Sequence, residues 1–143
     1  MMTEVAPIVI DPIVPEDGRD VYRIAQEEGL PAAWKWPEGL PGTAARVNGR
    51  VVAFCVIKET IYGIVIDQLW REHTREGKIG IYRLGDWIEE TMQRLANERG
   101  IPIACGGIIR TEMWKHDRAL ALRGFEIIAN VREKRYLPQV AAI

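Results

Sequence analysis

The chain has 143 residues, of which 48% are hydrophobic and 27% are charged, and its formal net charge is −1. This composition is that of a globular protein rather than a disordered chain, and no stretch approaches the ~20 consecutive apolar residues that a transmembrane helix needs. A charge this close to zero gives no electrostatic basis for binding nucleic acid or an anionic membrane, so neither is expected as a partner.

The first third of the chain predicts a strand, a helix and an irregular loop. Residues 6–11 are a short apolar run that ends at prolines, as an edge strand does. Asp17 is expected to cap a helix that carries apolar residues at helical spacing and stops at Gly29. Residues 30–42 are rich in proline and glycine, which excludes a long helix or a central strand there.

Three strands are predicted in the middle of the chain. Residues 43–47 and 51–57 are apolar stretches that flank Asn48-Gly49-Arg50, and Asn-Gly favours a tight hairpin turn. A second turn, at residues 59–63, leads into an apolar strand at residues 62–70.

A long amphipathic helix is predicted after a polar turn at residues 71–77, and it ends at Gly100. Its apolar stripe consists of Ile81, Leu84, Ile88, Met92 and Leu95. This spacing is typical of a helix that lies on a sheet.

The junction between the third of these strands and the long helix reads Arg75-Glu76-Gly77-Lys78-Ile79-Gly80. Small residues before a helix let backbone N–H groups converge on an anion, and the helix dipole adds positive potential. We therefore predict that residues 75–80, termed the diphosphate corner, bind a diphosphate. An ordinary polar turn is the alternative. Glu72 is expected to point to solvent, because it would otherwise repel the anion.

The last third of the chain predicts a strand, a helix and two further strands. Residues 101–105 are an apolar run after a helix, which indicates a buried parallel strand. Thr111 is expected to cap a helix, and residues 125–131 and 132–137 alternate as strands do. Because no repeat or linker interrupts the chain, residues 1–143 are expected to form a single domain with a mixed sheet.

Cys55 and Cys105 lie in apolar runs and lack the spacing of metal ligands, so no metal site is predicted. Reduced core thiols are favoured over a disulfide, and Cys105 as a nucleophile is a further alternative. The N-terminal residues show no signal-peptide pattern, so a cytoplasmic location is expected.

The order of elements, with the diphosphate corner after the fourth strand, resembles the GNAT superfamily of acyl-coenzyme A N-acyltransferases. The family signature is Gln or Arg, two residues, Gly, one residue, and Gly or Ala. Arg75 and Gly80 take the first and last places, Lys78 stands where the middle glycine belongs, and Gly77 lies one position earlier. Residues 122–125, Leu-Arg-Gly-Phe, are similar to a Gly-Phe ending that is frequent in the family.

The resemblance implies an α/β (α+β) fold: a mixed, mostly antiparallel sheet with a central splayed parallel pair, flanked by helices. It also implies an enzyme that binds acetyl-CoA and transfers the acetyl group directly to a primary amine. The implied cofactor-binding residues are Gln68, Leu69 and Trp70 on the splayed strand and Arg75, Gly77, Lys78, Ile79 and Gly80 at the corner. The substitution Gly80→Glu is therefore expected to abolish cofactor binding and to leave the fold intact.

The implied catalytic residues depart from the family pattern. Leu120 occupies the place of a tyrosine acid that is frequent in the family, and Ile64 occupies that of a strand carboxylate base. Asp67 is then the candidate base, with a structural salt bridge as the alternative, because a charge in an apolar strand is costly unless paired. His116, one helical turn before Leu120, is the candidate acid, with a solvated surface histidine as the alternative. These departures favour a second hypothesis, a GNAT-fold CoA-binding or regulatory module with weak or no catalysis.

Trp34 and Trp36 are the candidate substrate-binding residues, because loops carry specificity and exposed tryptophans are uncommon without a partner. A buried plug within the loop is the alternative. The acceptor implied by the resemblance is a small molecule or a peptide with an amine, which the sequence does not identify. The oligomeric state is left open, with a homodimer as one alternative.

Overall fold

The computed structural model describes residues 6–29, 42–61, 63–109, 113–129 and 131–139. The chain divides into two compact units, a first unit of residues 1–107 and a second unit of residues 108–143. The single domain expected over residues 1–143 stays a prediction. None of the helices in the described residues is long and apolar enough to cross a membrane.

The first unit is built on one five-stranded sheet. Its strands, in spatial and sequence order, are β1 (Ile8–Pro12), β2 (Thr43–Val47), β3 (Arg50–Thr60), β4 (Gly63–Arg71) and β5 (Cys105–Gly107). All neighbours are antiparallel except β4 and β5, which are parallel. The predicted mixed, mostly antiparallel sheet is thus confirmed. The parallel pair, however, lies at one edge of the described sheet and not at its centre.

The hairpin between β2 and β3 follows directly from the sequence. Asn48 and Gly49 both have positive φ, 51° and 80°. These values are those of a two-residue turn whose twist matches the flanking strands, and Asn-Gly is the pair that adopts them most readily. Val47 lies opposite Arg50 and Arg46 opposite Val51, so the turn sets the register next to it. Between Arg46 and Ala45 the register shifts by one residue, because Ala45 lies opposite Ala53.

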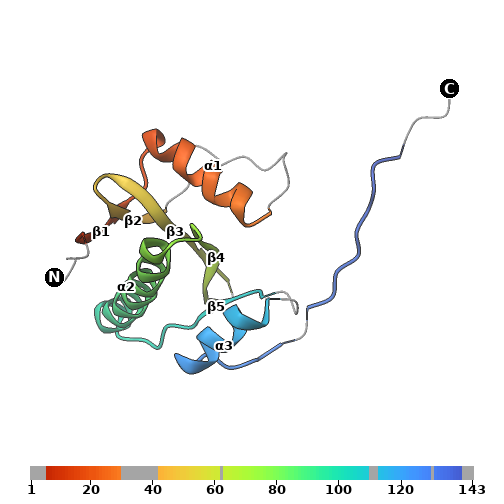
Figure 1. The fold of residues 1–143 in the computed structure, drawn as a ribbon. Helices are drawn as coiled ribbons and strands as arrows, with labels where there is room; N and C mark the ends of the chain where they lie inside the picture. Colours follow the sequence, from red (N-terminus) through yellow and green to blue (C-terminus); the bar gives the residue numbers. More distant parts are fainter. Residues whose placement is uncertain (1–5, 30–41, 62, 110–112, 130, 140–143) are drawn as a thin grey trace. The chain divides into compact units, whose positions relative to one another are not determined.

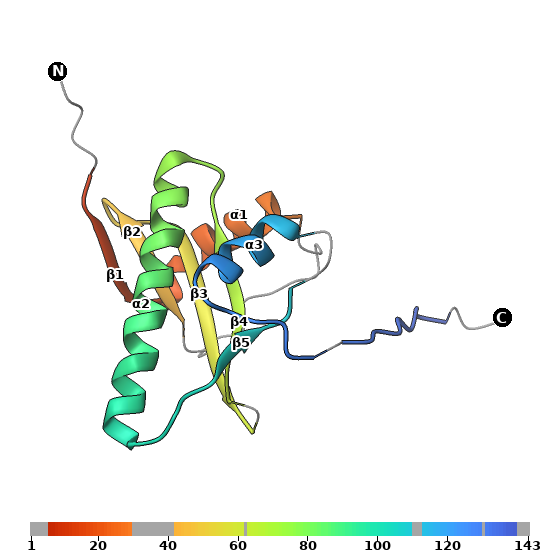
Figure 2. The ribbon, with the colours of Figure 1, turned by 90° about the horizontal axis from the view of Figure 1, so that it is seen from below.

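Two helices cover opposite faces of the sheet (Figure 1 and Figure 2). They are α1 (Gly18–Glu27), which follows a short 3-10 turn η1 (Pro15–Asp17), and α2 (Arg75–Arg99). Leu84, Ile88 and Met92 of α2 pack into one core, as the predicted stripe requires. Val21 and Ile24 of α1 pack into the other. Strand β3 contributes to both cores, which explains its long, uninterrupted apolar run.

Asp17 occupies the N-cap position of α1, as predicted, but its side chain makes no capping hydrogen bond. Its carboxylate instead accepts a hydrogen bond from the backbone N–H of Val14, at 2.8 Å, and pairs with Arg46 at 2.5 Å. Hydrogen bonding to the Arg46 guanidinium holds the pKa of Asp17 below its usual value. Arg46 also pairs with Asp11 on β1, so one guanidinium joins β1, β2 and η1.

The second unit contains one regular element among its described residues, helix α3 (Trp114–Leu122). The predicted cap, Thr111, lies outside the described residues. Residues 125–129 and 131–139 form no strand, so the prediction of two further strands is wrong for them. A strand needs a partner for its backbone groups, whereas alternation records only propensity. Ile127 and Ile128 are accordingly 85% and 91% exposed.

Candidate functional site

The edge of β4 becomes free where its pairing with β5 ends. The parallel register begins with Ile64 opposite Cys105. It ends with Ile66 opposite Gly107. From Asp67 to the end of β4, no described residue of the first unit pairs with the strand on that side. Within the described first unit, the last residues of β4 therefore have no strand partner on this side.

A β-bulge lies where the two strands part. On the other side of β4, Val56 pairs with Gln68, whereas the next residue, Ile57, pairs with Ile66. Asp67 is therefore the extra residue between the two pairs. A bulge bends its strand and increases the local twist, and this one follows Ile66, the last residue of β4 that pairs with β5. Nothing in the sequence signals this bulge, because its residues continue an apolar run.

The N-terminus of α2 begins four residues after β4 ends. Thr74 is the N-cap, and its Oγ1 accepts a hydrogen bond from the backbone N–H of Gly77 at 3.1 Å. Arg75 and Lys78 in this first turn are exposed, and their side chains make no ion pair or hydrogen bond with another described residue. The helix dipole and two uncommitted cations together favour an anion at this place.

The two glycines of the diphosphate corner are required by packing. A Cβ on Gly77 would lie 2.1 Å from the backbone oxygen of Glu72. A Cβ on Gly80 would lie 2.9 Å from Cγ2 of Val52 and 3.2 Å from Cβ of Ala45, because this side of α2 lies against the sheet. The expectation that Gly80→Glu leaves the fold intact is therefore wrong, since the new side chain would be forced into the sheet. A direct role of either glycine in cofactor binding stays a prediction.

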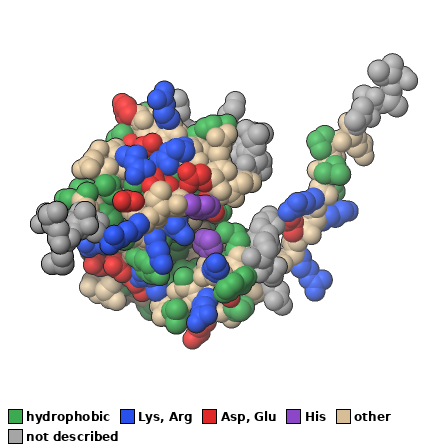
Figure 3. Space-filling view, in the orientation of Figure 1, with side chains coloured by type: hydrophobic (Ala, Val, Ile, Leu, Met, Phe, Trp, Pro, Cys, Tyr) green, Lys and Arg blue, Asp and Glu red, His purple; other side chains and the backbone are tan. Residues whose placement is uncertain are grey.

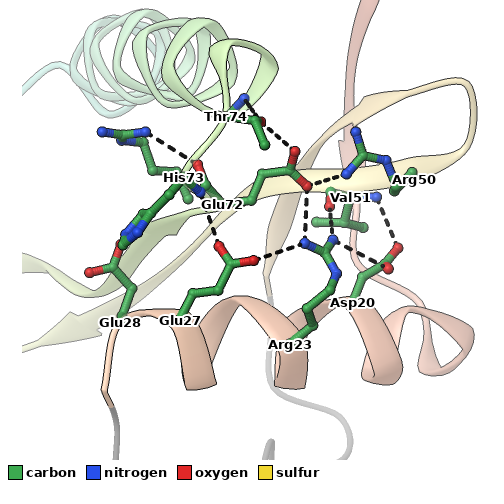
Figure 4. Close-up of polar contacts among 11 residues, drawn as sticks. Asp20, Arg23, Glu27, Glu28, Arg50, Val51, Glu72, His73 and Thr74 are labelled. Atoms are coloured by element: carbon green, nitrogen blue, oxygen red, sulfur yellow. Dashed lines mark hydrogen bonds and ion pairs between the residues drawn. The ribbon is translucent and has the colours of Figure 1, made fainter.

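Glu72 is fully buried, so the expectation that it points to solvent is also wrong. Figure 4 shows its carboxylate between Arg23 of α1, Arg50 at the start of β3, and the hydroxyl of Thr74. The Arg23 Nη1 to Glu72 Oε1 distance is 3.1 Å. Two guanidinium groups and a hydroxyl offset the desolvation of one carboxylate. Sequence reasoning missed this cluster because Arg23 lies 49 residues from Glu72.

His73 fastens the same segment to the end of α1. Its backbone N–H donates to the carboxylate of Glu27 at 3.0 Å, and its Nε2 lies 2.9 Å from Oε1 of Glu28. Its side chain remains 56% exposed. Residues 72–74 are thus held between α1 and the first turn of α2 (Figure 4).

Charges of both signs are interspersed among the described side chains on the face shown in Figure 3. This mixture agrees with the net charge of −1. The positive potential at the N-terminus of α2 is therefore local, and its source is the helix end with Arg75 and Lys78 rather than a broad basic surface.

No family model matches the sequence, and no curated protein matches it. Solved structures match its fold. Ard1 from Thermoplasma volcanium is 21% identical with a TM-score of 0.64, over 85% of this chain and 84% of that one. A transcriptional regulator from Bacillus halodurans C-125 is 14% identical with a TM-score of 0.65, over 91% and 100%. Naa50 from Arabidopsis thaliana, in complex with the bisubstrate analogue CoA-Ac-MVNAL, is 12% identical with a TM-score of 0.57, over 85% of each chain.

The matched structures include GNAT acetyltransferases, Ard1 and Naa50 among them. The chain has the GNAT fold. The resemblance is thereby confirmed at the level of the fold. At sequence identities of 11–21%, these structural matches establish the fold of the chain but not its activity. The activity has to be argued from the site.

On β4, three residues predicted to bind cofactor follow the bulge. Leu69 packs against the core on the α2 side of the sheet. Trp70 packs against the core on the α1 side, and its indole N–H donates to the side chain of Gln68. These side chains already contact other parts of the protein. The groups of this strand that remain for binding a ligand are therefore those of its backbone.

Asp67 pairs with Lys58 of β3, with 3.3 Å between Oδ2 and Nζ, and its side chain is 35% exposed. The structural salt bridge that the sequence left open is therefore present. It does not remove Asp67 from consideration as a base, since the carboxylate lies at the bulge where the GNAT strands part and remains partly open to solvent.

The other candidate positions fall in different parts of the chain. Ile64 is 6% exposed and belongs to the core, as an apolar residue should. His116 and Leu120 lie on α3 in the second unit, both half-buried. Asp67, by contrast, lies in the first unit. Trp34 and Trp36 lie outside the described residues.

The two cysteines are free thiols. Burial raises the pKa of Cys55 to about 12, and it also raises the pKa of the half-buried Cys105. Since the thiolate is the reactive form, neither cysteine is activated at neutral pH. This argues against the nucleophile alternative for Cys105. No group of three or more potential metal-binding side chains is found in the described ranges.

Proposed function

We propose that this chain is an acetyl-CoA-dependent N-acetyltransferase that passes the acetyl group directly to a primary amine. The observation that supports it most is the edge of β4 from Asp67 to Arg71, which pairs with no described residue of the first unit on one side and is followed by the N-terminus of α2. A free strand edge suits an extended, amide-containing arm, and a helix N-terminus suits a diphosphate. Acetyl-CoA contains both groups.

Each part of the site has a task in this proposal. Arg75 and Lys78, with the first-turn N–H groups of α2, bind the diphosphate. The backbone of Gln68, Leu69 and Trp70 holds the pantetheine arm, and an N–H of this strand polarises the thioester carbonyl. Most of the rate enhancement then comes from holding the amine beside a polarised carbonyl. The fold match to Naa50, whose structure contains a CoA-peptide bisubstrate analogue, supports this division of tasks.

Proton transfer is assigned to Asp67 and His116. The amine attacks only when neutral, so Asp67 accepts its proton, directly or through a water molecule. His116 delivers a proton to the leaving thiolate, in place of the tyrosine that is absent at Leu120. Asp67→Asn and His116→Ala are each expected to lower turnover by ~10²-fold with little change in acetyl-CoA affinity. Unchanged turnover in both variants would mean that positioning alone catalyses the reaction.

Trp34 and Trp36 are proposed to line the acceptor side of the site. Their loop follows α1, whose last residues contact His73 beside the diphosphate corner. The acceptor class is an amine on a peptide or a small molecule. The fold match to Naa50, whose bisubstrate analogue contains a peptide, supports a peptide as the acceptor.

A CoA-binding or regulatory module is the second candidate. Leu120 and the buried Ile64 provide no proton-transfer group at two places where the family often has one. The fold match to a transcriptional regulator supports a non-enzymatic use of the same architecture. Both candidates require the cofactor site, and they differ in whether acetyl transfer occurs.

The two candidates are separated by one pair of measurements. Calorimetry with acetyl-CoA, CoA and desulfo-CoA tests the cofactor site, and both candidates predict binding. Release of CoA from acetyl-CoA is then followed across a panel of peptide and small-molecule amines. Turnover with any amine supports the enzyme. Binding without turnover across the panel would leave the regulatory module, and absence of binding would refute both.

A further inference from the structure

Glu72 is a buried charge that the proposed chemistry does not use. It is 0% exposed, although it lies in a turn between a strand and a helix, where side chains usually reach solvent. A buried carboxylate carries a large desolvation cost, and its partners here come from three separate elements. Such an arrangement suits a residue that positions a neighbouring part of the protein.

The carboxylate reaches the first turn of α2 through a chain of two hydrogen bonds. Thr74 Oγ1 donates its proton to Oε2 of Glu72. Because that proton is committed, the oxygen of Thr74 is left to accept the backbone N–H of Gly77, at 3.1 Å. The charge of Glu72 therefore fixes the orientation of the hydroxyl that caps the helix.

The backbone of Glu72 also contacts the first turn of α2. Its N–H donates to the carbonyl of Val52 at 2.8 Å, which anchors the residue to β3. Its carbonyl oxygen then lies where a Cβ on Gly77 would be, only 2.1 Å away. The first turn of α2 thus rests directly on residue 72.

Arg23 and Arg50 fix the carboxylate and also balance its charge. Both donate to Oε1 of Glu72, and Arg23 also donates to the carbonyl of Val51 at 3.1 Å. An unpaired carboxylate this close to a helix N-terminus would oppose an incoming diphosphate. Arg23 also pairs with Asp20 and Glu27, so the cluster as a whole carries no positive excess. The two guanidinium groups on Oε1 offset the charge of Glu72 itself.

We infer that Glu72 is a positioning residue for acyl-CoA, acting through Thr74 and Gly77 on the first turn of α2. It does not touch the cofactor. It holds the diphosphate-binding N–H groups in place, while Arg23 and Arg50 keep its charge from repelling the phosphates. This inference rests on the proposed function, because it concerns the affinity of the same cofactor site.

The test compares Glu72→Gln and Thr74→Val with the conservative variant Thr74→Ser. The glutamine lacks the charge that orients the hydroxyl, the valine keeps the shape of threonine without the hydroxyl, and the serine keeps the hydroxyl. Asp20→Asn is the matched acid-to-amide control: Asp20 pairs with Arg23 and accepts the Val51 N–H, but it makes no contact with the first turn of α2. Each variant is first checked for native circular dichroism.

Calorimetry with CoA, well below the melting temperature of every variant, is the main measurement. Glu72→Gln and Thr74→Val are expected to raise the Kd for CoA about tenfold, which corresponds to about 1.4 kcal/mol. Thr74→Ser and Asp20→Asn are expected to bind as the unmodified chain does. With an amine substrate, the KM for acetyl-CoA rises by the same factor while kcat at saturation stays unchanged. A merely structural residue would lower the melting temperature without moving Kd.

If Glu72→Gln does not fold, the Thr74→Val and Thr74→Ser pair carries the test alone. Binding of CoA by both Glu72→Gln and Thr74→Val as tightly as by the unmodified chain would overturn the inference and leave the proposed function standing. An unmodified chain that binds no CoA would overturn the proposed function and this inference with it.

Discussion

Gly77 offers the sharpest test of how α2 packs on the turn before it. Gly77→Ala would place a Cβ 2.1 Å from the backbone oxygen of Glu72, whereas ordinary contacts begin near 3.4 Å. The oxygen belongs to a backbone anchored to Val52, so it cannot move aside as a flexible side chain would. Overpacking of this kind costs ~1–3 kcal/mol, and we take the upper end. Alanine recovers up to ~1 kcal/mol of helix propensity, which leaves a net destabilisation of ~2 kcal/mol.

Urea unfolding followed by circular dichroism measures this cost. With a slope of ~2 kcal/mol per molar urea, the midpoint of Gly77→Ala should fall by ~1 M. Gly18→Ala is the matched control, since Gly18 begins α1 with φ of −52° and nothing lies within 4 Å of its added Cβ. That variant should gain ~0.4–1 kcal/mol from the reduced entropy of the unfolded chain. Equal midpoints for the two variants would refute the close approach of Gly77 to Glu72.

Three further predictions concern binding, pH and thiol reactivity. Arg75→Ala should weaken CoA binding by ~1.5–3 kcal/mol in calorimetry, the value of one charge-assisted hydrogen bond, with an unchanged melting temperature because the side chain is exposed. The lowered pKa of Asp17 means that its stabilisation is complete above its unfolded pKa of 3.8 and is lost as the pH falls through the folded value. Asp17→Asn should therefore lower the free energy of unfolding at pH 7 by ~3 kcal/mol, because Arg46 loses one of its two carboxylate partners. The melting temperature of this variant should also fall less steeply at acid pH than that of the unmodified chain. An equally steep fall would contradict the prediction. In Ellman titration at pH 8, Cys105 should react slowly and Cys55 only after unfolding, so rapid labelling of two thiols in the native chain would contradict their burial.

Local signals in the sequence determined most of the first unit. Asn48-Gly49 fixes a hairpin because its two residues adopt positive φ more readily than others, and that turn sets the register of its strands as far as the shift between Arg46 and Ala45. The apolar stripe from Ile81 to Leu95 predicts both α2 and its buried face. The spacing of these residues indicates a helix, and their apolar character indicates which side of that helix faces the core. The order of elements, together with the motif at residues 75–80, then indicated the GNAT fold.

Tertiary structure alone decided the features that depend on distant partners. The bulge at Asp67 arises from the register between β3 and β4, which leaves no mark in an apolar run. The burial of Glu72 depends on Arg23, which lies 49 residues away in the chain. Gly80, which the sequence placed at a ligand, lies against the sheet.

The end of the chain shows the same division. Residues 125–137 have the alternation and the β-branched side chains of strands, and this local preference is all that a sequence pattern records. A strand forms only where a neighbouring backbone accepts and donates its hydrogen bonds, and the described part of this segment has no such neighbour. The sequence by itself thus determined which segments can form strands and helices. Only the tertiary structure decided which of them pair, because pairing depends on partners that are remote in the chain.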